Sequence, residues 1–136
     1  MTIHDASDGG CLCGAVRYRV QGAPIARTLC HCASCRRAAG APTVAWTIFP
    51  ADGFTFVTGK PKSFRSSPHI ERSFCGDCGT PLVYRSDRRP DVVDVTTASL
   101  DEADSFPPER EIWTEEKLVW EVVNDAIPQY PRSSKG

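Results

Sequence analysis

Residues 74–79, Phe-Cys-Gly-Asp-Cys-Gly, contain Cys75 and Cys78 in the spacing C-x-x-C. Two thiols at this spacing can point at one metal ion from a tight turn, and the following glycine relieves crowding where backbone amides approach sulfur. A second pair, Cys11 and Cys13, forms C-x-C between glycines. Together the two pairs supply four ligands, the number that closes a structural zinc site. We therefore predict a structural zinc that joins an N-terminal strand to the middle of a sheet.

The other three cysteines lie in Cys30-His31-Cys32-Ala33-Ser34-Cys35. Clustered thiols are typical of soft or borderline metals such as zinc, whereas inert buried thiols would scatter. Three thiols in six residues can occupy three corners of a tetrahedron and leave the fourth corner open. The seven cysteines thus divide as four plus three, and we predict two Zn²⁺ per chain, with Cys30, Cys32 and Cys35 holding the second one.

Two alternatives remain for these cysteines. His31, His4 or His69 would close the second site as Cys3His and make it another structural site. In the other alternative, residues 30–35 and the C-x-x-C pair combine as a zinc ribbon, which would leave the C-x-C pair without a metal. Spacing alone does not decide between these arrangements and the four-plus-three division.

Electrostatics indicate what an open three-thiolate zinc would do. Three thiolates on a divalent ion leave a charge of −1, so the metal is a poor Lewis acid for water activation. Such a centre should instead accept a fourth sulfur, deprotonate an incoming thiol and hold it beside an electrophile. We predict that His31 relays a proton and that Arg36 and Arg37 offset charge or bind a substrate carboxylate. The alternative for both arginines is a solvated helix face.

The composition is that of one globular domain. The chain has 136 residues, of which 40% are hydrophobic and 24% charged, so we expect a single domain over 1–136 with loose tails at 1–8 and 129–136.

A net charge of −1 provides no general positive field that would attract phosphate, so we expect no nucleic-acid partner. The N-terminal residues do not resemble a secretory signal, and the longest uncharged stretch, 38–51, contains Gly and Pro. We expect a cytoplasmic protein with no membrane partner. Structural disulfides are rare in the cytoplasm.

Alternating patterns predict mainly strands. Apolar and polar residues alternate from 16 to 21, and a hairpin is expected over 43–58 with its turn at Asp52-Gly53. Further strands are expected at 70–74, 81–85 and 92–98. Residues 33–39 should form a short helix, while 115–124 fit either a short helix or a strand. These elements predict a mainly β architecture with small helices.

With these residues in place, the sequence resembles the glutathione-dependent formaldehyde-activating enzyme family, which also contains centromere protein V. The resemblance rests on the motifs at 10–16, 30–37 and 74–82, and on Thr97-Ala98-Ser99-Leu100-Asp101 leading to Ile112-Trp113. It implies folded antiparallel sheets of β-tent type and two zinc sites. By this resemblance Cys11, Cys13, Cys75 and Cys78 bind the structural zinc, and Cys30, Cys32 and Cys35 form the site that takes the thiol of glutathione.

The activity implied by the resemblance joins glutathione and formaldehyde into S-hydroxymethylglutathione, and its reverse is that of a carbon-sulfur lyase. We therefore expect zinc-dependent binding of a small thiol such as glutathione, with formation or cleavage of a carbon–sulfur bond to an aldehyde-derived carbon. The rival hypotheses are a non-catalytic, zinc-stabilised interaction module and a carrier of glutathione or its adduct.

Overall fold

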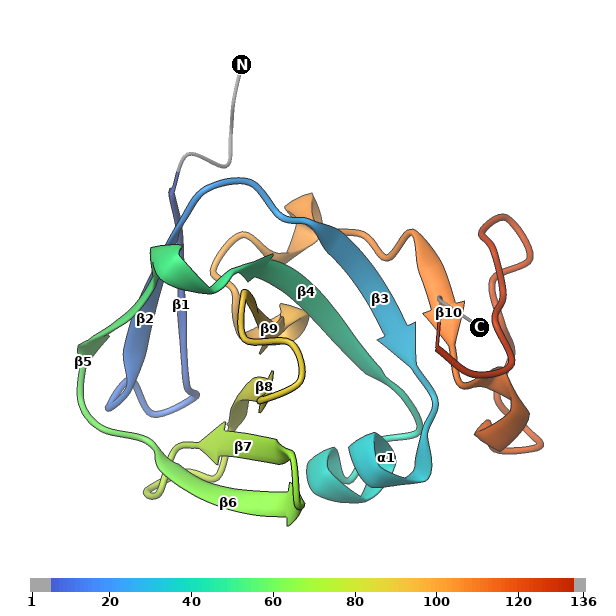
Figure 1. Cartoon of the computed structure of the whole chain (residues 1–136), viewed down its shortest axis with the longest axis horizontal. Coiled ribbons are helices and arrows are strands. Elements are labelled where there is room, and N and C mark those ends of the chain that lie inside the picture. The colour runs from blue at the N-terminus through green and yellow to red at the C-terminus, as the bar shows by residue number, and fades with distance from the viewer. Residues whose placement is uncertain (1–5, 134–136) are drawn as a thin grey trace.

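The computed structural model describes residues 6–133, which form two β-sheets with short helical segments (Figure 1). The smaller sheet has the order β1-β2-β5, and the larger has the order β10-β3-β4-β9-β8-β7-β6. All pairings are antiparallel except that of β10 with β3. The strands are β1 Ala6–Gly10, β2 Arg17–Gln21, β3 Ala26–Cys30, β4 Val44–Pro50, β5 Phe54–Thr58, β6 Lys62–Ser67, β7 Ile70–Phe74, β8 Pro81–Ser86, β9 Val92–Thr96 and β10 Arg110–Ile112. The mainly β prediction is confirmed.

The single α-helix of the described chain, α1, spans Ala33–Ala39 and begins directly after the C-x-C of the second cysteine motif. Cys32 is its N-cap, and the Cys32 sulfur accepts the backbone N–H of Cys35 at 3.3 Å. Gly40 ends the helix in the left-handed region, at φ 63°, which glycine adopts without steric cost. Four 3₁₀ turns, at 51–53, 97–99, 103–105 and 114–116, complete the helical segments. Within residues 6–133, the helices are too short or too polar to cross a membrane.

The predicted hairpin at 43–58 is wrong, although both of its strands exist. Strand β4 lies between β3 and β9, so both of its edges are already paired, and β5 pairs with β2 in the other sheet. The predicted turn is a 3₁₀ turn, Ala51–Gly53, that carries the chain from one sheet to the other. Gly53 lies so close to the backbone of Gln21 that an added Cβ would lie 2.2 Å from the Gln21 carbonyl oxygen. Ring stacking of Phe54 on Tyr18, with centroids 5.4 Å apart, holds β5 on the smaller sheet.

Other expected boundaries also change. The last strand of the predicted set ends at Thr96 and continues as a 3₁₀ turn, and 115–124 forms no regular element beyond the 3₁₀ turn at 114–116. Of the tails expected to be loose, residues 6–8 belong to β1, while Gln129 and Tyr130 are hydrogen-bonded to Glu111. These pairings could not be foreseen from the polar character of both segments. The remainder of both predicted tails falls partly outside the described residues.

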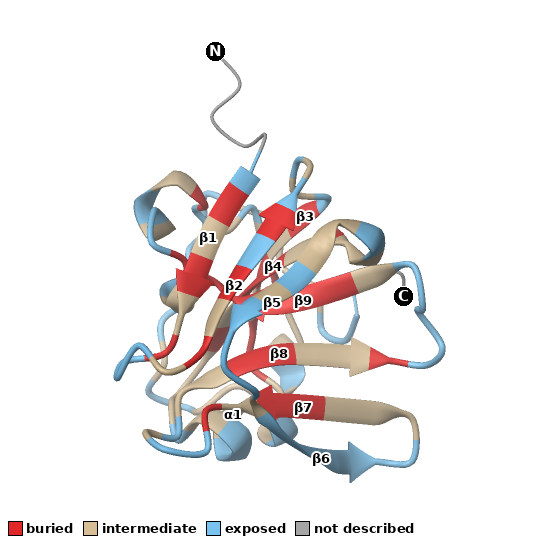
Figure 2. Cartoon of the chain, turned by 90° about the vertical axis from the view of Figure 1, so that its left-hand side faces the viewer, coloured by how far each residue is buried: buried red, intermediate tan, exposed pale blue. Residues whose placement is uncertain are grey.

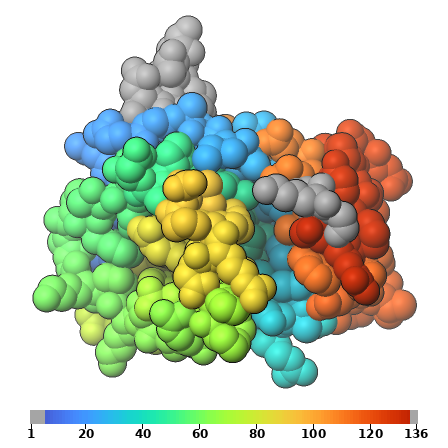
Figure 3. All heavy atoms as spheres, viewed as in Figure 1, coloured from blue at the N-terminus to red at the C-terminus, as the bar shows by residue number. Residues whose placement is uncertain are grey.

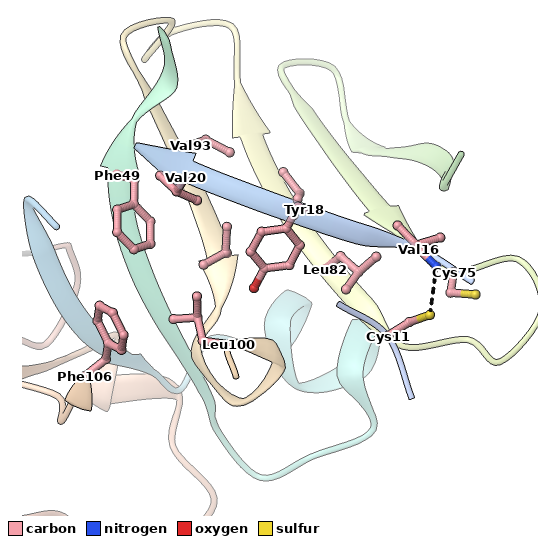
Figure 4. Close-up of a cluster of buried hydrophobic side chains, with 12 residues drawn as sticks. Cys11, Val16, Tyr18, Val20, Phe49, Cys75, Leu82, Val93, Leu100 and Phe106 are labelled. Atoms are coloured by element: carbon pink, nitrogen blue, oxygen red, sulfur yellow. Dashed lines mark hydrogen bonds between the residues drawn. The ribbon is translucent and has the colours of Figure 1, made fainter. Parts of the chain in front are cut away.

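The main core lies between the two sheets, as the buried faces of β2, β8 and β9 show in Figure 2. Tyr18, Phe49 and Leu82 are fully enclosed within it. Figure 4 shows that Cys11 and Cys75 form one end of this cluster, where the Cys11 sulfur accepts the backbone N–H of Val16 at 3.3 Å. The first cysteine cluster is therefore part of the core that holds the two sheets together. A smaller cluster, built on Cys30, Cys35, Val44 and Trp46, lies on the larger sheet.

Candidate metal centres

The four-cysteine cluster brings together two segments that are distant in sequence. The sulfurs of Cys11, Cys13, Cys75 and Cys78 all lie within 4.8 Å of one another. The Cys13 sulfur is 3.7 Å from that of Cys11 and 3.8 Å from that of Cys75. Four sulfurs at the usual Zn–S distance of about 2.3 Å form a tetrahedron with edges of about 3.8 Å. The cluster therefore has the donor type and the spacing that a closed zinc site needs.

Backbone amides and one threonine surround these sulfurs with donors. The amides of Asp77 and Cys78 both donate to the Cys75 sulfur at 3.4 Å. Thr80 lies 3.2 Å from the Cys78 sulfur, and hydrogen bonds from Thr80 lower the pKa of Cys78 to about 5. The Thr80 oxygen also accepts the N–H of Leu12, which links the two halves of the cluster. Donors of this kind stabilise thiolates, the form of cysteine that binds metal.

The second cluster contains Cys30, Cys32 and Cys35, whose sulfurs also lie within 4.8 Å of one another. Cys30 is the last residue of β3, and the other two belong to the start of α1. Cys30 and Cys35 are buried, whereas Cys32 is partly exposed. All three line a cavity of about 860 Å³. The cluster is thus held on one side by the larger sheet and is open to a large cavity on the other.

No histidine within residues 6–133 joins either cluster. His31 bonds Glu111, and His69 bonds Asp87 at 2.9 Å on the surface. His4 lies outside the described residues. The two groups of sulfurs are separate, so the zinc-ribbon alternative is wrong. Within the described chain, the second cluster therefore offers three protein atoms that could bind a metal and no fourth.

Arg72 is the main charged neighbour of the second cluster, and no sequence motif indicates this role. It lies on β7 and is buried, with both terminal nitrogens 3.7 Å from the Cys35 sulfur. Its Nε donates to the Ser66 hydroxyl at 3.0 Å, and its guanidinium lies 4.9 Å from the centre of the Tyr84 ring. Hydrogen bonds from the Cys30 and Cys32 thiols, together with the charge of Arg72, lower the pKa of Cys35 to about 3. A fixed cation therefore faces the sulfur that most readily ionises.

His31 is not among the residues that line the cavity, and it is hydrogen-bonded to Glu111. Its Nε2 donates to a Glu111 carboxylate oxygen at 2.5 Å, and both side chains are almost fully buried. The other Glu111 oxygen accepts the N–H of Asn124 at 2.6 Å and receives Gln129 Nε2 at 3.4 Å. Figure 3 shows this C-terminal part of the chain lying beside the segment that contains β3 and α1. Glu111 thus ties the C-terminal segment to the loop between two cysteine ligands.

Replacing Glu111 with glutamine should lower the free energy of unfolding by about 2–3 kcal/mol, because a buried amide N–H₂ would face donors that now bind a carboxylate. Burial acts to raise the pKa of Glu111, but hydrogen bonds from Asn124, His31 and Gln129 outweigh it and lower that pKa. The carboxylate therefore contributes stability at neutral pH, and this contribution is lost as the pH falls through the lowered folded-state pKa. Chemical denaturation from pH 7 into the acid range should show the difference between the two proteins shrinking. Glu102→Gln, at an exposed position, is the control. An equal loss of unfolding free energy in that variant would contradict the stabilising role of Glu111.

The two arginines expected from the sequence lie elsewhere. Arg36 donates to the carbonyl oxygens of His31 and Glu116 at 3.3 and 3.5 Å, and Arg37 is exposed on α1. Neither is among the residues that line the large cavity. The arginines that do line it are Arg72, Arg88, Arg89 and Arg110, which come from β7, the loop after β8 and β10. The topology of the sheet brings these arginines together, and their spacing in the sequence does not predict it.

The fold and these sites define a mainly β protein with two separate cysteine clusters, one of four sulfurs and one of three sulfurs open to a cavity. The family model of the glutathione-dependent formaldehyde-activating enzyme matches residues 6–116. The chain therefore belongs to this family.

Individual relatives agree with this assignment. The chain is 30% identical over 122 residues to a Halomonas elongata protein that is named a putative glutathione-dependent formaldehyde-activating enzyme. The aligned region covers 83% of this chain and 78% of the relative. It is 33% identical over 79 residues to an uncharacterised lyase of Schizosaccharomyces pombe, with 57% of this chain and 56% of the relative covered. A crystal structure of a Rhodobacter sphaeroides protein matches 90% of this chain and 98% of its own, with a TM-score of 0.61 and 19% identity. The last match shows the fold alone.

Proposed function

We propose that the Cys30/Cys32/Cys35 centre binds zinc and takes the thiol of glutathione as its fourth ligand, and that it promotes formation and cleavage of a carbon–sulfur bond to an aldehyde-derived carbon. The observation that carries this proposal is a cluster of three sulfurs that lines a cavity of about 860 Å³ and has no fourth ligand within residues 6–133. Zinc bound there would lower the pKa of an incoming thiol and present it as a nucleophile. Binding of a second Zn²⁺ by the four-cysteine cluster is part of the same proposal.

Arg72 offsets the charge that thiol binding adds. Three thiolates and one zinc carry −1, and a fourth thiolate brings the centre to −2. The Arg72 guanidinium, 3.7 Å from the Cys35 sulfur, lowers the electrostatic free energy of this negative charge. The attraction is strong because Arg72 is buried, where water screens charges less. Stacking on Tyr84 and the bond to Ser66 hold the guanidinium in place. We assign Arg72 as a positioning and charge-balancing residue of this centre.

Carboxylate recognition fits the arginines of the cavity better than those of α1. Arg89 is paired with Asp94 at 3.1 Å, whereas Arg110 bonds a neutral hydroxyl, that of Thr28, at 3.1 Å. We propose Arg110 as the main partner of a glutathione carboxylate. Arg36 and Arg37 stay predictions as substrate-binding residues, and His31 acts through its bond to Glu111 as a positioning residue rather than as a proton relay.

The proposed chemistry requires thiols that stay reduced. Free thiolates and glutathione coexist in the cytoplasm, and we place the protein there. We propose a small thiol as its partner, with no role for membranes or nucleic acid.

Native mass spectrometry and metal analysis, combined with NMR exchange measurements, test the proposed function. We expect two zinc ions per chain, one bound glutathione and faster exchange between glutathione and its formaldehyde adduct. Arg72→Met should weaken glutathione binding by about tenfold or more, because a charge-assisted contact to sulfur is lost. Arg85→Met is the matched control, since Arg85 also stacks on an aromatic ring, at 5.4 Å from that of Phe54. Binding without faster exchange would indicate a carrier, and absence of binding would exclude the proposal.

A further inference from the structure

A second, smaller cavity adjoins the three-cysteine cluster. It has a volume of about 290 Å³ and touches Cys35 but neither of the other two cluster cysteines. Cys35, Trp46 and Arg72 line both this cavity and the large one, so the two adjoin at these three residues. The other walls are largely apolar and include Ala38, Ala39, Val44, Phe64, Phe74 and Val83. We refer to this space as the apolar cavity.

Ser73, Thr96 and Arg72, three polar side chains in its walls, are already hydrogen-bonded. The hydroxyl of Ser73 pairs with that of Ser63 at 3.0 Å, and the hydroxyl of Thr96 donates to the Pro81 carbonyl oxygen at 2.8 Å. All three guanidinium nitrogens of Arg72 have partners, in Ser66 and Cys35. A ligand in this space would therefore find few side-chain groups free to bond it. Apolar cavities of about 150 Å³ stay dry and bind benzene, so this one has room for a larger hydrocarbon group.

Neither reactant of the family's name-giving reaction uses such a space. Glutathione is polar along its whole length, and formaldehyde carries only hydrogen on its carbonyl carbon. We propose that the carbonyl partner of this protein is an aldehyde with an apolar alkyl or aryl substituent, and that this substituent occupies the apolar cavity. The inference rests on the proposed function of the three-cysteine centre and names its second substrate class.

The reaction keeps its balance with the larger aldehyde. The thiolate sulfur forms a bond to the carbonyl carbon, the carbonyl π electrons move to oxygen, and that oxygen takes the proton that the thiol released. The product is a hemithioacetal, and the reverse reaction returns the thiol and the aldehyde. Nothing is oxidised or reduced. A substituent in the apolar cavity would lie next to Cys35, which also lines the large cavity proposed for the thiol.

Stable thioethers of glutathione test the cavity by binding alone. Calorimetry on the zinc-loaded protein would compare S-methylglutathione with S-hexylglutathione. Burial of about 0.8 kcal/mol per methylene corresponds to about fourfold in affinity, so five further methylenes, partly buried, should give about 100-fold tighter binding. Equal affinities, or failure of both thioethers to bind where glutathione binds, would overturn the inference.

A variant that fills the apolar cavity tests whether the preference for S-hexylglutathione arises there. Ala38 is exposed on α1 and lines the apolar cavity, so Ala38→Phe adds a ring there with little risk to folding. We expect it to reduce the hexyl preference to within about threefold while glutathione still binds. Val57→Phe is the matched control, because Val57 is 56% exposed on β5 and lines neither cavity. An unchanged preference in Ala38→Phe would overturn the assignment to this cavity.

Exchange kinetics separate this inference from the proposed function. NMR exchange rates of the glutathione adducts of formaldehyde and hexanal should show acceleration mainly for hexanal in the wild type, and loss of that acceleration in Ala38→Phe. Acceleration for formaldehyde alone would leave the proposed function standing and overturn the inference. Failure of glutathione itself to bind would overturn both.

Discussion

Replacing Cys78 with serine should abolish cooperative folding. The four-cysteine cluster joins the turn after β7 to the segment after β1, and Cys11 and Cys75 are part of the main core. Structural zinc contributes on the order of 10 kcal/mol in small zinc modules, which is comparable with the entire stability of a typical domain. Removing one of the four sulfurs therefore removes most of what holds the two sheets together at this end.

Circular dichroism and zinc analysis would measure this effect. The variant should lack a cooperative thermal transition and should hold less than one zinc per chain, since the remaining site depends on the fold. Asp77→Asn is the control, because Asp77 is exposed and only its backbone N–H contacts a cluster sulfur, that of Cys75. A folded Cys78→Ser protein with a normal transition would show that this cluster is not structural.

Replacing Cys32 with serine should have the opposite effect to Cys78→Ser: the protein should stay folded but lose the thiol-binding site. Cys32 is partly exposed and belongs to neither set of fully buried residues. Serine is among the best N-cap residues, so α1 should still begin at this position. With two sulfurs left, the second centre should lose its zinc, and glutathione affinity should fall at least about 100-fold, as expected when a metal ligand is removed.

Native mass spectrometry with and without glutathione would show one zinc instead of two and no glutathione adduct, while the thermal transition stays within a few degrees of the wild type. Ser34→Ala is the matched control, since Ser34 lies in the same segment and is exposed. If Cys32→Ser unfolds while Ser34→Ala does not, both clusters are structural, and the proposed thiol chemistry has no open centre.

The difference between these two variants follows from where each cluster lies. The first contributes to the core between the sheets, whereas the second sits at the end of one strand and the start of one helix. It packs against Val44 and Trp46 on the larger sheet, and Arg72 contacts its Cys35 sulfur. A metal centre on local segments can be emptied at modest cost to the fold, and it can also exchange a ligand.

Much of this arrangement could be predicted because cysteine spacing is a local property. C-x-C, C-x-x-C and C-x-C-x-x-C show which neighbouring sulfurs can share one ion, and a total of seven indicates that one centre lacks a fourth cysteine. Alternation of apolar residues likewise predicted a strand over 16–21, which is observed as Arg17–Gln21. The further strand expected at 70–74 is present, and residues 33–39 form the expected helix.

The surroundings of the second centre come from contacts between segments that are distant in the sequence. Arg72 reaches Cys35 across 37 positions of sequence, and Glu111 reaches His31 across 80, so no spacing rule relates them. The division of β4 and β5 between two sheets, and the apolar cavity beside Cys35, likewise depend on which strand edges pair at long range. Cysteine spacing predicted the four-plus-three division, and the fold distinguishes it from the zinc-ribbon alternative. What faces the open position depends on long-range strand pairing, because pairing places side chains from distant segments around one cavity.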